Sequence, residues 1–81
     1  MNDLESAEKI SIDIKKLERN LKQVEDINCE GKEKEVYDRA VDYMNDSKYY
    51  LEKKKDMRTA FGCIEYSHGL LDALRMIHGL I

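Results

Sequence analysis

Apolar residues recur every three or four positions through most of this chain, which is the spacing of one face of an α-helix. The first helix is expected from about residue 3 to residue 27, and Ile12 falls outside its apolar face. That face is a single narrow row, which suits a helix lying along a helical hairpin or along a partner helix. The pattern alone leaves open whether this helix packs on its own chain or on a neighbouring copy. The row consists of Ala7, Ile10, Ile14, Leu17, Leu21 and Val24.

A second helix is expected from about residue 33 to residue 54, after a loop at 28–32 that contains Gly31. Glycine suits such a loop because it adopts positive φ at little cost. Tyr49 lies off the apolar face of this helix and is expected to face water. The inward face is predicted to consist of Val36, Tyr37, Ala40, Val41, Met44, Ser47 and Leu51.

A third helix is expected from about residue 57 to residue 79, with Asp56 as its N-cap. Two neighbouring rows of apolar and small residues run along it, and a surface helix normally has only one. We therefore expect protein to cover more than half of the circumference of this helix. The first row is Met57, Ala60, Ile64, Ser67, Leu71 and Leu74; the second is Cys63, Tyr66, Leu70, Ala73, Ile77 and Leu80.

The turn between the second and third helices is short, which makes the two helices antiparallel neighbours. Folding the chain in the lysine-rich turn places Ser47 opposite Ala60, and Ala40 opposite Ser67. Small residues would then face small residues in two layers, allowing the helices to approach closely. The sequence therefore predicts an all-α fold: an antiparallel up-down-up three-helix bundle over residues 1–81, in which helices 2 and 3 form a tight hairpin.

The composition fits one small helical domain, with 81 residues, no proline and 38% charged residues. The net charge of −3 provides no general attraction for nucleic acid or anionic membrane. Cys29 and Cys63 have no metal-finger spacing, so we expect reduced thiols in a cytoplasmic protein. No stretch reaches the length of a membrane span, so we expect no membrane partner.

Residues 50–75, YLEKKKDMRTAFGCIEYSHGLLDALR, carry a recognisable pattern. A tyrosine-rich helix end with Tyr-Leu-Glu precedes a lysine-rich turn, and Ala-Phe-x-Cys-Ile-x-Tyr-Ser-His-Gly-Leu-Leu-Asp-Ala follows it. In this pattern the chain resembles the short archaeal proteins grouped as domain of unknown function 357. The resemblance implies an all-helical bundle in an archaeal cytoplasm. It implies no activity, because the family has none assigned.

Two glycines mark one side of the third helix. Gly62 and Gly69 are seven residues apart and therefore share a face, and each costs about 1 kcal/mol relative to alanine inside a helix. Such a groove lets another backbone approach closely. We expect the first helix of the same chain to lie in it, with a second subunit or a ligand as the alternatives.

Glu65, His68 and Asp72 also share one face of the third helix, since they are spaced i, i+3 and i+7. A helical carboxylate and imidazole at this spacing could form half of a metal site, or an acid–base pair. We expect instead a plain polar strip in which Asp72 bonds Arg75 or His68. His78 is expected to be a partly buried histidine at the helix end. No catalytic constellation is evident, so we expect neither an enzyme nor a bound cofactor or metal.

These observations favour a small protein-interaction or assembly module, most simply a homodimer, that binds through a helical surface. The predicted interaction surface is Gly62, Glu65, His68, Gly69, Asp72 and Arg75. One alternative is a metal- or small-ligand-binding bundle centred on Glu65, His68 and Asp72. Another is an RNA-associated adaptor that uses residues 53–55 and nearby tyrosines, although the chain lacks the basic groove that nucleic acid requires.

Overall fold

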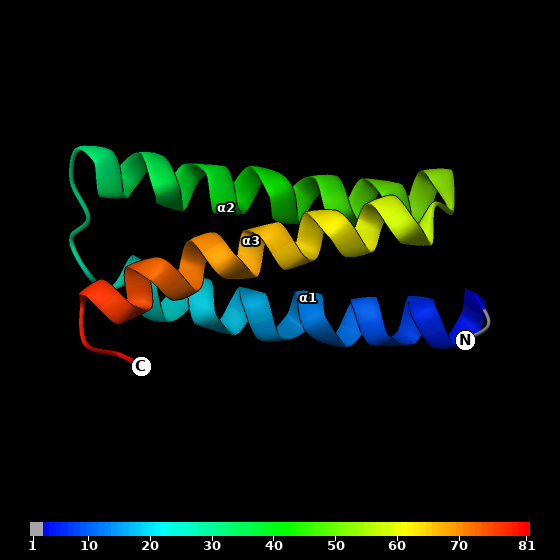
Figure 1. Ribbon diagram of the computed structural model, residues 1–81, viewed down its shortest axis with the longest axis horizontal. Helices are drawn as coiled ribbons and strands as arrows, with labels where there is room; N and C mark the ends of the chain where they lie inside the picture. Colours follow the sequence, from blue (N-terminus) through cyan, green and yellow to red (C-terminus); the bar gives the residue numbers. More distant parts are fainter. Residues whose placement is uncertain (1–2) are drawn as a thin grey trace.

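The computed structural model describes the backbone of residues 3–81 and the side chains of residues 6–81. Three long helices follow one another: α1 (Asp3–Glu25), α2 (Lys32–Tyr49) and α3 (Met57–Ile77). A short π-helical segment, η1 (Tyr50–Lys54), continues α2. Figure 1 shows the helices running side by side in alternating directions, with the α1–α2 loop and the end of α3 at the same end of the bundle. The predicted all-α, up-down-up architecture is confirmed.

Helix α1 packs on its own chain, mainly against α3. Its predicted apolar row forms one side of the core, whereas Ile12 is exposed as expected. Because consecutive members of the row are three or four residues apart, they stay on the side of α1 that faces the hairpin. The five fully covered members of the row are Ile10, Ile14, Leu17, Leu21 and Val24.

Helices α2 and α3 are joined across their interface by two buried serines. The Ser47 hydroxyl of α2 donates to the Ala60 carbonyl of α3 at 2.7 Å. In return, the Ser67 hydroxyl of α3 donates to the Ala40 carbonyl of α2 at 2.5 Å. All four residues are fully buried, so the predicted pairing of small residues is confirmed. The alanines leave room for each hydroxyl to reach a main-chain oxygen, which meets the hydrogen-bonding requirement of a buried polar group.

The chain reverses direction between α2 and α3 without a glycine. The α-helix expected to continue to Lys54 instead ends at Tyr49 and widens into the π-helical η1. Lys55 then adopts a left-handed conformation with φ 55°, and the Asp56 N–H donates to the Tyr50 carbonyl at 2.9 Å. A left-handed lysine is unfavourable by about 1–2 kcal/mol, and this closing hydrogen bond helps to hold it there.

Asp56 caps α3, as predicted. Its carboxylate accepts hydrogen bonds from the Thr59 N–H at 3.1 Å and from the Thr59 hydroxyl at 2.6 Å. These two bonds lower the pKa of the Asp56 carboxyl, because they stabilise its charged form. The predicted start of α3 is therefore confirmed.

Helices α1 and α3 each end two residues earlier than predicted, at Glu25 and Ile77. At the end of α3, Gly79 is left-handed with φ 71°. The Gly79 N–H donates to the Met76 carbonyl at 3.1 Å, and the Leu80 N–H to the Arg75 carbonyl at 2.8 Å. This pair of bonds is a Schellman cap, which satisfies carbonyls that the helix end leaves free. No helix in the described part of the chain is both long and apolar enough to cross a lipid bilayer.

Candidate functional site

The side of α3 that points away from the bundle has no side chain at two of its central positions. Gly62 and Gly69 are exposed, and a Cβ atom added to either would meet nothing within 4 Å. The expectation that their groove seats α1 is therefore wrong. The buried row of α3 that contains Ile64 and Leu71 lies on the opposite side of the helix, and α1 contacts α3 through His68 and Arg75. At about 100° per residue, the glycines lie roughly half a turn of the helix away from that buried row.

Large apolar side chains share this side of α3 with the two glycines. Tyr66, Met76 and Ile77 are 55%, 68% and 65% exposed. We call this surface the outer face of α3 and define it by six residues: Gly62, Tyr66, Gly69, Ala73, Met76 and Ile77. It contains half of the second predicted row. Half of the second row, namely Tyr66, Ala73 and Ile77, therefore remains open to solvent, whereas Cys63, Leu70 and Leu80 are half-buried.

One edge of the outer face is held in place by α2. The ring of Tyr66 packs against the ring of Tyr43, with a centroid distance of 4.6 Å and an interplanar angle of 55°. A tilted aromatic pair at this distance is favourable, so Tyr66 is oriented although it is half exposed. Arg58 and Glu65 also lie on the exposed side of α3. The outer face therefore combines apolar projections, of which Tyr66 is held by α2, with two gaps, and one charge of each sign lies beside it.

The polar residues predicted beside the glycines lie partly elsewhere. Glu65 is exposed next to the outer face. His68 Nε2 instead donates to the Asp13 carbonyl of α1 at 3.1 Å. Arg75 donates to Asp72 at 3.0 Å, as one of the sequence alternatives proposed, and to the Gln23 side chain of α1 at 3.2 Å. His68 and Arg75 therefore tie α3 to α1 and do not form one continuous surface with the glycines.

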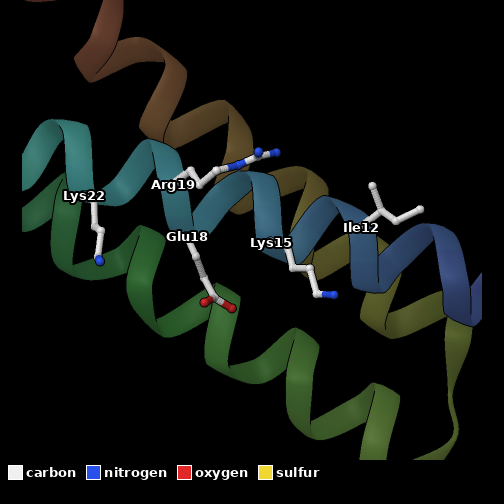
Figure 2. A pocket seen from close by; sticks show the side chains of 5 residues that line it. All are labelled: Ile12, Lys15, Glu18, Arg19 and Lys22. Atoms are coloured by element: carbon white, nitrogen blue, oxygen red, sulfur yellow. The ribbon is translucent and has the colours of Figure 1, made fainter.

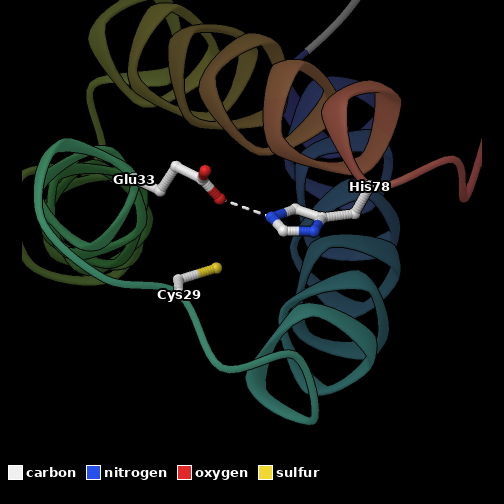
Figure 3. Close-up of side chains that lie close together, drawn as sticks. All are labelled: Cys29, Glu33 and His78. Carbon is white, nitrogen blue, oxygen red and sulfur yellow. Dashed lines mark hydrogen bonds and ion pairs between the residues drawn. The ribbon is translucent and has the colours of Figure 1, made fainter.

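The candidate metal residues Glu65, His68 and Asp72 are not brought together as ligands. Among residues 6–81, the group of three metal-binding side chains that does converge is Cys29, Glu33 and His78, whose ligand atoms lie within 4.8 Å of one another. Figure 3 shows them pointing toward one another from the α1–α2 loop, the start of α2 and the end of α3. Sequence reasoning missed this cluster. The only local signal was the four-residue spacing of Cys29 and Glu33, because His78 arrives through the tertiary fold.

Within this cluster, His78 Nε2 and a Glu33 carboxylate oxygen are in direct hydrogen-bond contact. His78 is the C-cap residue of α3, and its side chain is partly covered, as expected. Burial, followed by the negative charge of Glu33, raises the pKa of the Cys29 thiol. Cys29 therefore carries a neutral thiol at physiological pH when no cation is present.

Two further charged regions lie on the outside of α1 and in the turn between α2 and α3. Figure 2 shows Lys15, Arg19 and Lys22 around a shallow hollow on the outside of α1, with the Glu18 side chain directed toward α2. Glu18 pairs there with Lys48 at 3.2 Å. In the lysine-rich turn, the Lys54 ammonium lies 5.9 Å from the centroid of the Tyr49 ring, a distance compatible with a cation–π contact.

The fold and the exposed helix define a small up-down-up helical bundle with one apolar face left open. The chain belongs to the family described as protein of unknown function (DUF357), whose model matches residues 13–80. This match confirms the resemblance seen in residues 50–75 and extends it over all three helices. The search of curated proteins found no match.

Proposed function

We propose that this protein is a small interaction and assembly module whose outer face of α3 binds a second copy of the chain. The observation that supports this proposal is the open space at Gly62 and Gly69. Each glycine disfavours the helix by about 1 kcal/mol relative to alanine. The described fold gains no packing in return, since a methyl group would fit at both positions. A close approach of another helix from outside would account for both residues.

A second copy suits this surface because a two-fold interface uses the same patch on both subunits. Such a patch must be complementary to itself, so it needs side chains that project and gaps that receive the projecting side chains of the other subunit. The outer face has projecting side chains at Tyr66, Met76 and Ile77, and gaps at Gly62 and Gly69. Large exposed apolar groups gathered on one face are typical of binding surfaces. Arg58 and Glu65, the two exposed charged residues of α3 beside the face, carry opposite charges.

The proposed setting is an archaeal cytoplasm. The archaeal part of this proposal rests on the family resemblance of residues 50–75. The cytoplasmic part is supported by Cys29 and Cys63, which are both free thiols. Free thiols suit a reducing compartment.

The test is the mass of the protein in solution, measured by sedimentation equilibrium over a range of micromolar concentrations. The wild type is expected to change from 9.5 kDa to twice that mass as concentration rises. Gly69→Leu is expected to remain monomeric, because a leucine would fill the gap that the partner needs. Asn45→Leu is the matched control: it adds a leucine to an exposed position of α2 and is expected to dimerise like the wild type.

Two results would refute the proposed module. One is a wild type that stays at 9.5 kDa throughout the concentration range. The other is a folded Gly69→Leu variant that dimerises as strongly as the wild type. Circular dichroism on each variant separates loss of association from loss of fold.

A further inference from the structure

We propose that Cys29, Glu33 and His78 form a binding site for a single zinc ion at the end of the bundle where α1 meets α2. Cys29 and Glu33 are four residues apart, His78 comes from the far end of the chain, and all three side chains point toward a common point (Figure 3). This site is separate from the outer face of α3, and the inference does not depend on dimerisation.

The chemistry of the three side chains suits zinc. A thiolate and an imidazole select zinc over magnesium or calcium, which prefer ligand sets made only of oxygen. Zinc also accepts a carboxylate oxygen, and it often uses three protein ligands with the fourth position open to solvent. With zinc bound, the charges of a Cys29 thiolate and a Glu33 carboxylate would balance those of the ion. His78 would bind as a neutral imidazole.

The geometry requires only small movements of side chains. In a tetrahedral zinc site the ligand atoms are about 3.3–3.7 Å apart, as follows from bonds of about 2.0–2.3 Å. The three ligand atoms already lie within 4.8 Å of one another. His78 and Glu33 share a hydrogen bond, so zinc would replace the shared proton and separate the two atoms slightly. Cys29 would close the remaining distance by rotating its side chain.

The backbone on either side of the cluster is fixed by two left-handed glycines. Gly31, with φ 61°, immediately precedes α2 and lies between Cys29 and Glu33. Gly79, with φ 71°, follows His78 and forms the Schellman cap of α3. A side chain at either position would be strained, since other residues disfavour positive φ. The two glycines therefore fix the backbone conformation beside Cys29, Glu33 and His78, so that the positions of these three residues are well defined.

The site is also accessible. The side chains of Glu33 and His78 are 38% and 27% exposed, which leaves an entry path for an ion. Cys29 borders a hollow of about 330 Å³ that is also lined by Asn28, Lys34 and Tyr37. A solvent water that reaches the partly exposed side chains of Glu33 and His78 can complete the coordination of zinc. Since zinc would connect the α1–α2 loop to the end of α3, its binding is expected to stabilise the fold.

The proposal is tested by titrating tag-free, chelator-treated protein with zinc chloride in a calorimeter. One equivalent of zinc is expected to bind and to raise the melting temperature. Cys29→Ser and His78→Gln are each expected to weaken binding by at least about a hundredfold, since even indirect partners of a metal are worth 10–100-fold. Cys63→Ser is the matched control, because Cys63 is the other half-buried free thiol and lies outside the cluster.

Cobalt provides a second measurement, made on the wild type and on the control variant Cys63→Ser. Cobalt(II) bound to the wild type is expected to show a thiolate-to-metal charge-transfer band, which Cys63→Ser retains. The site is refuted if the wild type binds no zinc, if cobalt shows no such band, or if a folded Cys29→Ser variant binds zinc as tightly as the wild type. None of these results bears on the mass of the protein, so the proposed dimer is tested separately.

Discussion

The two opposite faces of α3 both carry small residues seven positions apart, with very different surroundings. On the inner face, Ala60 and Ser67 are fully buried, and each takes part in a hydrogen bond with α2. On the outer face, Gly62 and Gly69 have nothing within 4 Å of where a side chain would begin. Packing against α2 explains the pair of small residues on the inner face. No contact within the described part of the chain explains the pair of glycines on the outer face. A small residue in a helix points to a close neighbour only after the structure shows which way it faces.

The largest difference between the two faces is expected for matched truncations of isoleucine. Ile64→Ala should destabilise the fold by about 2–5 kcal/mol, because Ile64 is fully buried and its truncation leaves a cavity in the core. Ile77→Ala removes the same atoms from a side chain that is 65% exposed, so the monomer should change by less than about 0.5 kcal/mol. Urea unfolding at low protein concentration measures both values. Equal losses would show that the outer face is covered within the monomer.

A leucine substituted on each face should give a smaller difference in unfolding free energy between the two faces. Ser67→Leu should cost about 1–3 kcal/mol, since the added atoms overpack the α2–α3 interface and the hydrogen bond to Ala40 is lost. Gly69→Leu, only two residues away, should leave the unfolding free energy of the monomer unchanged or raise it, because its side chain enters open space. Thermal unfolding of both variants checks this prediction. A destabilised Gly69→Leu monomer would contradict the assignment of Gly69 to an open face.

Replacing glycine by alanine should change stability in opposite directions at two sites. Gly69→Ala should stabilise the monomer by about 0.5–1 kcal/mol, as expected for an unobstructed helix position. Gly79→Ala should destabilise it, because alanine disfavours the φ of 71° that the Schellman cap requires. Chemical unfolding below the concentration at which the protein associates measures both. Two changes of the same sign would count against this explanation of the glycines.

The smallest effect is expected at the exposed ion pair between α1 and α2. Glu18→Gln removes the partner of Lys48, whose ammonium lies 3.2 Å from the Glu18 carboxylate. Because the Lys48 and Glu18 side chains are 37% and 50% exposed, the loss should be at most about 1 kcal/mol and should shrink as salt is added. Unfolding of wild type and variant at low and high salt gives the comparison. A large, salt-independent loss would mean that Glu18 has another role in the packing of α1.

Much of the fold was predictable from the sequence, because helical periodicity is a local signal. The row from Ile10 to Val24, the cap at Asp56 and the pairing of Ser47 with Ala60 all follow from spacing and from a short turn. The π-helical end of α2 was not predictable in this way. Its wider turn and the left-handed Lys55 are set by how the hairpin closes, and nothing in the local sequence distinguishes them from an ordinary helix end.

The outer face of α3 and the cluster at Cys29 and His78 were less predictable, because both depend on how the three helices are arranged relative to one another. Spacing showed that Gly62 and Gly69 share a face, but the position of α1 decides whether that face is inside or outside. His68 was grouped with Glu65 by spacing, yet the nearness of α1 gives it the Asp13 carbonyl as a partner. Cys29 and His78 are 49 positions apart in the sequence. Only the up-down-up path of the chain brings them to the same end of the bundle.

The crossed serine bonds limit how the hairpin can move. A slide of α2 along α3 by one helical turn, about 5.4 Å, would withdraw the Ser47 and Ser67 hydroxyls from their carbonyl partners at the same moment. Each hydroxyl would then need a new partner inside the α2–α3 interface, because a buried hydroxyl without a hydrogen bond is unfavourable. Sliding of α2 along α3 is therefore disfavoured, and the two helices are expected to keep their register when the protein binds a partner.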